Sequence, residues 1–475
     1  MSPISQKSRT MDEDDGRGRP DRRCETPPSE RAGSWAVRFL PLLILTVGML
    51  FSIAAAYGVE RFPPPEFEGG YKMPPTTIPA ARSTSMEYFD VGALLAALTL
   101  ASWMSLKKRS RKGVFVVMLG SLLYFGFYRK GCICPVGSIQ DVTLALFQHS
   151  YVAPVTVVAF FLLPLIFALF FGRTFCAAVC PLGAMQDVVL VKPLKLRPWL
   201  EQTLGILPFL YLGLAVLFAA TGSAFVICQY DPFVSFFRRS GSFNMFVLGA
   251  AFLAVGLFYG RPYCRFLCPY GALLSLLSRF SQWKVTLSPD DCLQCKICDT
   301  ACPYGAISEP AAPPTDASRK SRRFRVVACS LLLPVLLLVG GWIGGQLNVT
   351  LSKKNPTVQL AERIAAEDAG KITDPTDPID ASKAFRQTGR ATQELIDDAL
   401  QVRRQFVIGG WILGAFVGLV FGAKLIALWG SQPADVYEPD SADCVACGRC
   451  YTYCPRVIVQ LKYINRKKVI PLTPV

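Results

Sequence analysis

Long apolar runs almost without charge constrain this chain more than any other feature of its sequence. They include residues 39–56, 153–171, 204–226, 326–343 and 406–428. A helix needs about 20 such residues to cross the hydrocarbon core of a bilayer. Buried helices of a soluble protein are the alternative, but 52% hydrophobic residues over 475 positions is too apolar for an ordinary soluble chain. The sequence therefore predicts a mainly α, polytopic membrane helix bundle.

About eight spans can be counted, at 36–57, 89–106, 113–128, 151–172, 204–227, 243–260, 325–346 and 406–429. The first could also be a signal peptide that ends in small residues. Its apolar run is longer than the usual core of about 7 to 15 residues in such peptides. We therefore expect an uncleaved membrane anchor at this position.

Basic residues cluster beside the spans and indicate the orientation. The runs 107–112 and 319–323 directly abut spans, as positively charged cytoplasmic loops do. An N-terminus in the cytoplasm places the loops 173–203 and 261–324 and the tail from 430 on that same side. The net charge of +16 then reflects topology, which predicts contact with membrane lipid and no nucleic-acid partner.

Two cysteine motifs share the spacing C-x2-C-x2-C-x3-C-P. The first contains Cys292, Cys295, Cys298 and Cys302, and the second contains Cys444, Cys447, Cys450 and Cys454. In two-cluster bacterial ferredoxins the first three thiolates hold one [4Fe-4S] cluster, and the fourth, before Pro, ligates the other cluster. The predicted ligand sets are therefore Cys292, Cys295, Cys298 with Cys454, and Cys444, Cys447, Cys450 with Cys302.

Zinc is the alternative occupant, because paired CxxC sequences also bind that metal. The even triple spacing followed by Cys-Pro favours two [4Fe-4S] clusters. Two expected spans separate the motifs and return the chain to the same side of the membrane. We therefore predict one split bacterial-type 2[4Fe-4S] ferredoxin domain on the cytoplasmic side.

An internal repeat supplies four more cysteines. Residues 172–184 and 260–272 both read G-R-x-(F/Y)-C-x3-C-P-x-G-A, with the pairs Cys176/Cys180 and Cys264/Cys268. Cysteines four apart lie on one helical face, so the two CxxxCP motifs could together supply thiolates to a third iron-sulfur cluster. A structural role or redox-active thiols are the alternatives.

A degenerate third copy at 130–142 contains the CxCP motif of Cys132 and Cys134. The alternation of spans places it outside, where Cys228 begins another short loop. These three thiols could form an outer metal or redox site; a disulfide or unpaired buried thiols are the alternatives. Such a site would provide an intermediate carrier across a hydrocarbon core about 30 Å thick.

These features divide the chain into segments with different expected roles. They are a disordered cytoplasmic tail at 1–34, a transmembrane bundle with the CxCP and CxxxCP motifs at 35–283, a first ferredoxin half at 284–310, a transmembrane helix at 325–346, an extracytoplasmic helical insert at 347–405, a transmembrane helix at 406–429 and a second ferredoxin half at 430–475.

Some cofactors are not expected. The chain has one histidine, His149, and no C-x-x-C-H sequence, so we expect no haem. It also has no Gly-rich dinucleotide loop after a strand and no P-loop, so we expect no NAD.

The sequence resembles the NosR/NirI and NapH group of membrane-bound 4Fe-4S polyferredoxins over residues 150–310 and the tail from 440. The likeness rests on 175–187, on 229–233 and on 263–272, which leads into the first ferredoxin motif. The resemblance implies quinol- or flavin-linked electron donors to extracytoplasmic reductases, some of which support maturation of a metal enzyme. The N-terminal FMN-binding domain of NosR has no counterpart here, so any flavin is expected on a partner flavoprotein.

Together these features predict an electron-transfer subunit of the cytoplasmic (inner) membrane rather than a stand-alone enzyme. It would relay electrons between a cytoplasmic or quinol donor and a membrane or extracytoplasmic redox partner. Lys296 and Arg449, inside the cluster loops, are candidates for tuning the potential. The alternatives are a regulatory or maturation protein that supports assembly of a metalloenzyme, and a membrane anchor whose clusters only stabilise the fold.

Overall fold

The computed structural model describes residues 83–131, 134–148, 151–238, 243–287, 292, 294–310, 316–370, 380–430 and 436–455. The polar tail, the first expected span at 36–57, Cys132 and His149 lie outside these residues. The described chain is helical apart from short loops and one two-stranded sheet.

Four helical segments of the described chain are long and apolar enough to cross a bilayer. They comprise α2 (Thr84–Ser102) continued by η1 (Trp103–Lys107), α7 (Pro198–Leu204) followed by α8 (Leu207–Ala220), α15 (Asp316–Gln346) and α19 (Thr392–Gly430). Shorter apolar helices occupy two other expected spans: α5 (Val155–Phe171) and α11 (Phe243–Gly256). A third, α13 (Pro269–Ser278), falls within the expected loop 261–324, which had not been predicted to contain an apolar helix. The predicted mainly α membrane fold is confirmed.

The remaining bundle helices are short, and two of them, α4 and α6, begin at the proline of a Cys-Pro sequence. They are α3 (Arg111–Ser121) with η2 (Leu122–Tyr128), α4 (Pro135–Phe147), η3 (Phe175–Val179), α6 (Pro181–Val188), α9 (Val226–Tyr230), α10 (Val234–Arg238) and α12 (Pro262–Phe266). Helices α4 and α13 both pack against α5 and α8. Fully buried Leu98, Met118 and Leu274 belong to this common core.

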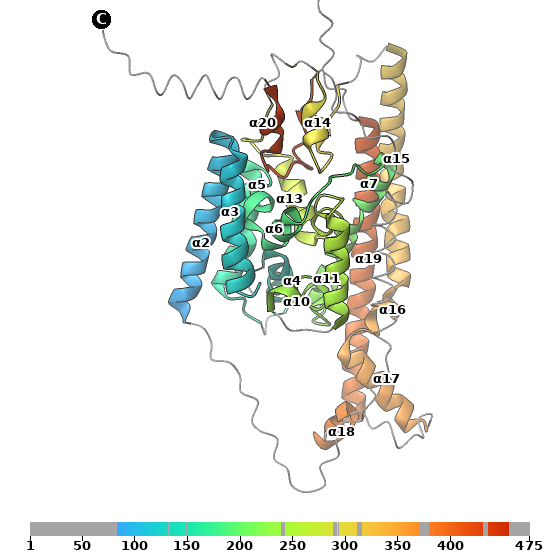
Figure 1. Cartoon of the computed structure of the whole chain (residues 1–475). Helices are drawn as coiled ribbons and strands as arrows, with labels where there is room; N and C mark the ends of the chain where they lie inside the picture. Colours follow the sequence, from blue (N-terminus) through green and yellow to red (C-terminus); the bar gives the residue numbers. More distant parts are fainter. Residues whose placement is uncertain are drawn as a thin grey trace, which may run out of the picture.

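The two long helices α15 and α19 run side by side (Figure 1) and make the two crossings between the cysteine motifs. Glycines allow their backbones to touch, as in small-residue contacts between membrane helices. A Cβ at Gly344 would clash with the carbonyl oxygen of Gly410, and one at Gly414 would clash with that of Gly340. After the insert that follows α15, the chain therefore runs back along α15 as α19.

The insert between these crossings is helical, as expected, but its boundary differs. It contains α16 (Asn348–Ser352), α17 (Pro356–Asp368) and α18 (Asp380–Gln387). Helix α19 starts at Thr392, so the expected boundary at residue 405 falls inside one continuous helix. The reason is packing, because Leu395 and Ala399 at the start of α19 share a small core with Val358, Ile364 and Phe385.

The two ferredoxin halves lie together at one end of the bundle, where α14 (Ile297–Ala301) contacts α20 (Arg449–Tyr453) (Figure 1). Strands β1 (Ile307–Ser308) and β2 (Glu438–Pro439) pair antiparallel across the halves, with Ile307 opposite Pro439. The backbone N–H of Asp440 also donates to the carbonyl of Ala306, at 2.8 Å. Segments more than a hundred positions apart thus form one small domain.

Candidate iron-sulfur sites

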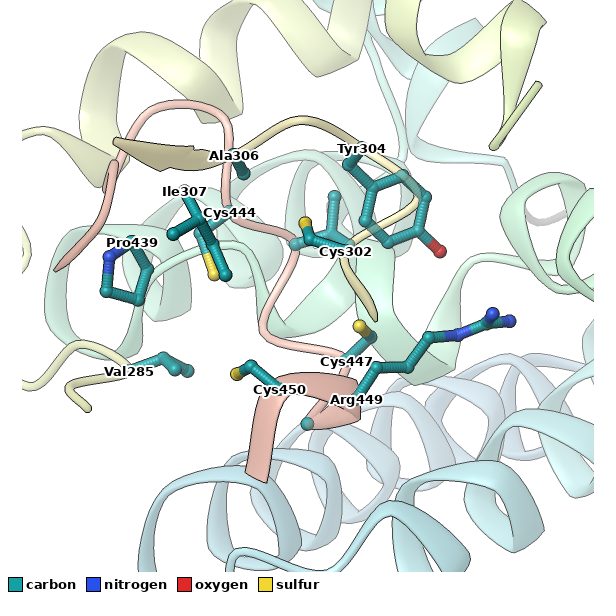
Figure 2. A pocket seen from close by; sticks show the side chains of 12 residues that line it. Val285, Cys302, Tyr304, Ala306, Ile307, Pro439, Cys444, Cys447, Arg449 and Cys450 are labelled. Carbon is teal, nitrogen blue, oxygen red and sulfur yellow. The ribbon is translucent and has the colours of Figure 1, made fainter. Parts of the chain in front are cut away.

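The four cysteines of one predicted set line a single pocket between the ferredoxin halves. Figure 2 shows Cys302 from the first half facing Cys444, Cys447 and Cys450 from the second. The pocket is partly open to solvent. Four thiols around one space are the donor set that a [4Fe-4S] cluster requires, so the residues fit the cofactor.

The other predicted set gathers around Cys298, which is buried. Its thiol interacts electrostatically with Cys454 from the second half, and with Cys295 and Cys292 from its own loop. Burial raises the pKa of Cys298 to about 11, with these thiols adding to the effect. Ligation by either set stays a prediction, but the structure brings each set together across the two halves.

The two cluster loops share a backbone conformation that side chains rarely adopt. Positive φ angles occur two residues after the first cysteine, at Gln294 (50°) and Ala446 (53°), and four residues after it, at Lys296 (60°) and Gly448 (73°). Strained backbone of this kind persists only where the surrounding structure imposes it, and it gathers at functional sites. The matched angles indicate that both loops are shaped for the same ligand.

Within the described residues, no three His, Cys, Asp or Glu side chains converge as ligands of a single metal ion. A four-iron cluster binds each thiolate at a different iron, so its ligands surround a space rather than a point. Burial raises the pKa of Cys444 to about 12, and the backbone N–H of Ala446 donates to its sulfur and opposes that shift. Such N–H donors are one means by which a protein sets a cluster's potential.

Asp187 of α6 joins the second ferredoxin half to the bundle. Its buried carboxylate lies 2.9 Å from Arg111, 3.2 Å from Arg449 and 3.5 Å from Arg261, and it accepts a 2.8 Å hydrogen bond from the hydroxyl of Tyr304. Burial alone would raise the pKa of Asp187, but the three guanidinium groups outweigh it and hold the pKa well below its usual range.

Further contacts tie both halves to the bundle. Arg111 donates to the carbonyl of Cys447 at 3.3 Å, and Arg173 donates to that of Ala442 at 2.9 Å. On the other half, Lys195 forms an ion pair with Asp299. Of the two residues expected to tune the clusters, Arg449 is part of the Asp187 network, whereas Lys296 is exposed.

The bundle cysteines gather in the main core, but not on two continuous helical faces as expected. Cys176 lies in η3, and Cys180 precedes α6; Cys264 lies in α12, and Cys268 precedes α13. Proline lacks the N–H that would continue a helix and is favoured at the first position of a new one. The Pro after each second cysteine therefore starts a new helix. The two cysteines of each pair lie at a junction between helices, and the expectation that they share one helical face is wrong.

The expected outer trio divides between two environments, and Cys132 lies outside the described residues. Cys134 precedes α4 and packs against the bundle core, where it interacts electrostatically with Asp231 and Cys180. Cys228 is exposed, and a Cβ at Gly137 would lie 3.3 Å from its sulfur. Cys134 thus lies on the side of the CxxxCP cysteines, because its Cys-Pro starts a helix that enters the bundle.

Sequence reasoning overlooked several residues that organise these sites. Gln186 receives a hydrogen bond from the N–H of Tyr263 and donates to the sulfur of Cys264, at 3.1 and 3.2 Å. In the degenerate copy, Gln140 receives one from the N–H of Ile227 at 3.0 Å. The available signal was the repeated Gln-Asp pair, whose glutamine lies six residues after the cysteine of Cys-Pro in both copies.

Fold and site together define a polytopic helical membrane protein that carries ferredoxin motifs. The profile of a family described as a 4Fe-4S binding domain matches residues 113–150, 153–199, 242–288 and 297–325. A second family of the same description matches residues 285–308. No solved structure matches significantly.

Curated relatives match over short segments. Protein NirI of Paracoccus denitrificans is 35% identical over 98 residues, which cover 20% of this chain and 14% of NirI. The putative electron transport protein YccM of Escherichia coli is 34% identical over 70 residues, 15% of this chain and 19% of YccM. An uncharacterized protein of Methanocaldococcus jannaschii, MJ0749, is 38% identical over 71 residues, 15% of this chain and 29% of its own length.

The matched segments thus span less than a third of each of these relatives. Over these segments the predicted resemblance to the NosR/NirI group is confirmed, because the chain is similar to NirI and matches the profiles of 4Fe-4S binding domains.

Proposed function

We propose that the chain is a membrane-bound iron-sulfur subunit that relays single electrons between redox partners. The observation that carries this proposal is the pocket lined by Cys302, Cys444, Cys447 and Cys450, because its thiols come from both motifs. The similarity to NirI and to the putative electron transport protein YccM supports the same class of function.

The clusters, when bound, would supply one-electron carriers. The protein's own part is to hold the two ligand sets at one end of the bundle and to set their electrostatic surroundings. The network of Asp187 with Arg111, Arg261 and Arg449 fixes the second half against the membrane domain. This keeps the ferredoxin domain in one position relative to the spans.

The ferredoxin halves are proposed to face the cytoplasm, across the cytoplasmic (inner) membrane from the outer partner. Arg111 belongs to the basic run 107–112 and touches both Cys447 and Asp187. The run therefore lies at the same end of the bundle as the ferredoxin halves. Short loops rich in Lys and Arg are retained on the cytoplasmic side, which supports this orientation.

The proposed orientation is also consistent with the classes of donor and acceptor. We propose a cytoplasmic reductant or a membrane quinol as the donor, and a membrane or extracytoplasmic redox protein as the acceptor, with a flavoprotein as the favoured class. One-electron carriers match quinones and flavins because these can change their oxidation state one electron at a time. A role in regulation or in maturation of a metalloenzyme is the rival function.

The test compares Cys298→Ser with the control Cys329→Ser in the full chain, purified anaerobically and studied by potentiometric EPR. Cys298 belongs to a predicted ligand set, whereas Cys329 lies on α15, remote from both motifs in sequence. We expect reducible [4Fe-4S] signals in wild type and control, and loss of one cluster in Cys298→Ser. Absence of any reducible cluster in the wild type would refute the relay.

A second readout separates the relay from maturation. In cells, Cys298→Ser should abolish electron delivery to the partner enzyme while leaving the metal content of that enzyme intact. If the partner's metal content falls and an artificial reductant does not restore its turnover, maturation is the function and the relay is wrong.

A further inference from the structure

The two CxxxCP repeats pack against each other in a reciprocal manner. A Cβ at Gly183 of the first repeat would lie 3.3 Å from the carbonyl oxygen of Cys176 and 3.2 Å from the guanidinium of Arg261 in the second repeat. A Cβ at Gly271 would lie 3.1 Å from the carbonyl oxygen of Cys264 and 3.6 Å from the guanidinium of Arg173 in the first repeat. Equivalent glycines thus meet equivalent groups, which relates the repeats by a pseudo-twofold arrangement.

The four repeat cysteines come together at this arrangement. The thiol of Cys268 interacts electrostatically with Cys264, Cys180 and Cys176, and Cys264 interacts with the two cysteines of the first repeat. A direct contact also crosses the repeats, because Gln186 of the first donates to the sulfur of Cys264 in the second at 3.2 Å. The pairs therefore form one set of four thiols.

The surroundings of these thiols suit a negative charge. Helices α6 and α13 begin at Cys180 and Cys268, where helix N-termini carry partial positive charge. The guanidinium of Arg261 is 2% exposed and donates to the carbonyl groups of Cys176 and Ala177.

Two buried donors near the repeats lack a partner. The Nε atoms of Arg173 and Arg261 form no hydrogen bond within the part of the chain that the structure describes. Buried cations are tolerated where an anion compensates them. Arg261 already pairs with Asp187, and four thiolates that share iron atoms would provide a further anion beside these guanidinium groups.

The set adjoins the ferredoxin pocket. Cys176 packs against the small core formed by Tyr304, Ala306, Val445 and Cys447, which Cys302 and Cys444 also contact. One thiol of the repeat set thus lies against residues that line the ferredoxin pocket, on the side that faces the bundle.

We propose that Cys176, Cys180, Cys264 and Cys268 together hold a third iron-sulfur cluster, which exchanges single electrons with the ferredoxin clusters. The exchange rests on the proposed relay function, whereas binding of the cluster does not. In the transfer, one ferredoxin cluster is oxidised by one electron and the third cluster is reduced by one. No bond to carbon, oxygen or hydrogen forms or breaks, and no proton is needed.

The test begins with iron and acid-labile sulfide per chain in the wild type, purified anaerobically in detergent. About twelve irons are expected for three [4Fe-4S] clusters, since two account for about eight. About ten irons with a [2Fe-2S] Mössbauer signature would also support the site and would identify a smaller cluster. About eight irons, with the repeat thiols open to alkylation or paired as disulfides, would overturn the proposal.

A variant assigns the additional iron. Cys264→Ala should lose about a third of the wild-type iron while the EPR signals of the ferredoxin pair persist, and the control Cys329→Ser should lose none. Gln186→Leu, which removes the donor to the sulfur of Cys264 without removing a ligand, should retain iron and shift the potential of the third cluster. Unchanged iron in a folded Cys264→Ala would contradict the assignment.

Failure of this site and failure of the relay give different results. If the third cluster is absent but the ferredoxin clusters are reducible, only the further site is lost. If all three clusters are bound but none is reducible by a quinol or a cytoplasmic reductant, the site stands and the relay falls.

Discussion

Arg449 of the second ferredoxin half lies 3.2 Å from Asp187 of the membrane bundle, and this carboxylate is fully buried. The same carboxylate pairs with Arg111 and Arg261. One acidic group thus compensates three guanidinium groups at the seam between the two parts of the molecule. Loss of this one carboxylate would therefore remove the negative charge that three guanidinium groups share at the contact between the ferredoxin half and the bundle.

Replacing Asp187 with Asn should therefore undock the second ferredoxin half. Removing one partner from a buried ion pair costs roughly 3–5 kcal/mol, because the remaining charge is left uncompensated. We expect a large fall in the thermal unfolding midpoint and loss of the clusters on gel filtration. Asp368→Asn is the control, since its pair with Arg386 is half exposed and should matter little.

The pH dependence of this contact follows from the lowered pKa of Asp187. A carboxyl whose pKa is lower in the folded than in the unfolded state stabilises the fold above its unfolded pKa, and loses that effect only as the pH falls through the folded value. The difference in unfolding midpoint between wild type and Asp187→Asn should thus stay constant from pH 8 down to about pH 5. A difference that closes between pH 7 and pH 5 would mean that the carboxyl is protonated there.

Features that depend on residues close together in the sequence could be predicted, whereas contacts between distant segments could not. The ligand sets around Cys298 and Cys444 follow from spacing within short loops, so they could be proposed without a structure. The network of Asp187 could not, because its arginines come from three distant segments. The expectation of one helical face for Cys176 and Cys180 was wrong for a local reason, since Pro181 starts a new helix.

The contact of α15 with α19 gives a prediction about the split domain. A methyl group at Gly414 would clash with the carbonyl oxygen of Gly340, so Gly414→Ala should separate the helices at a cost of about 1–3 kcal/mol. Because these helices carry the chain from one motif to the other, cluster content should fall together with thermal stability. Gly92→Ala is the matched control in another span, where a Cβ would meet nothing within 4 Å.

Each motif is predicted to supply the fourth ligand of the other motif's cluster. This arrangement predicts which pairs of cysteine substitutions should have additive effects on iron content. Cys302 lines the pocket with Cys447, although it follows Cys298 in the sequence. If it ligates the cluster of the second motif, the pair Cys302→Ser and Cys447→Ser should lose no more iron than either change alone, about four atoms.

Cys302→Ser combined with Cys298→Ser should lose about eight irons, because these residues then serve different clusters. Iron quantification on the three single and two double variants decides between the two ligand arrangements. The reverse pattern, with additivity for Cys302 and Cys447 but not for Cys302 and Cys298, would show that each motif holds its own cluster. The two ferredoxin halves would then be held together without a shared ligand, by contacts such as the strand pair and those of α14 with α20.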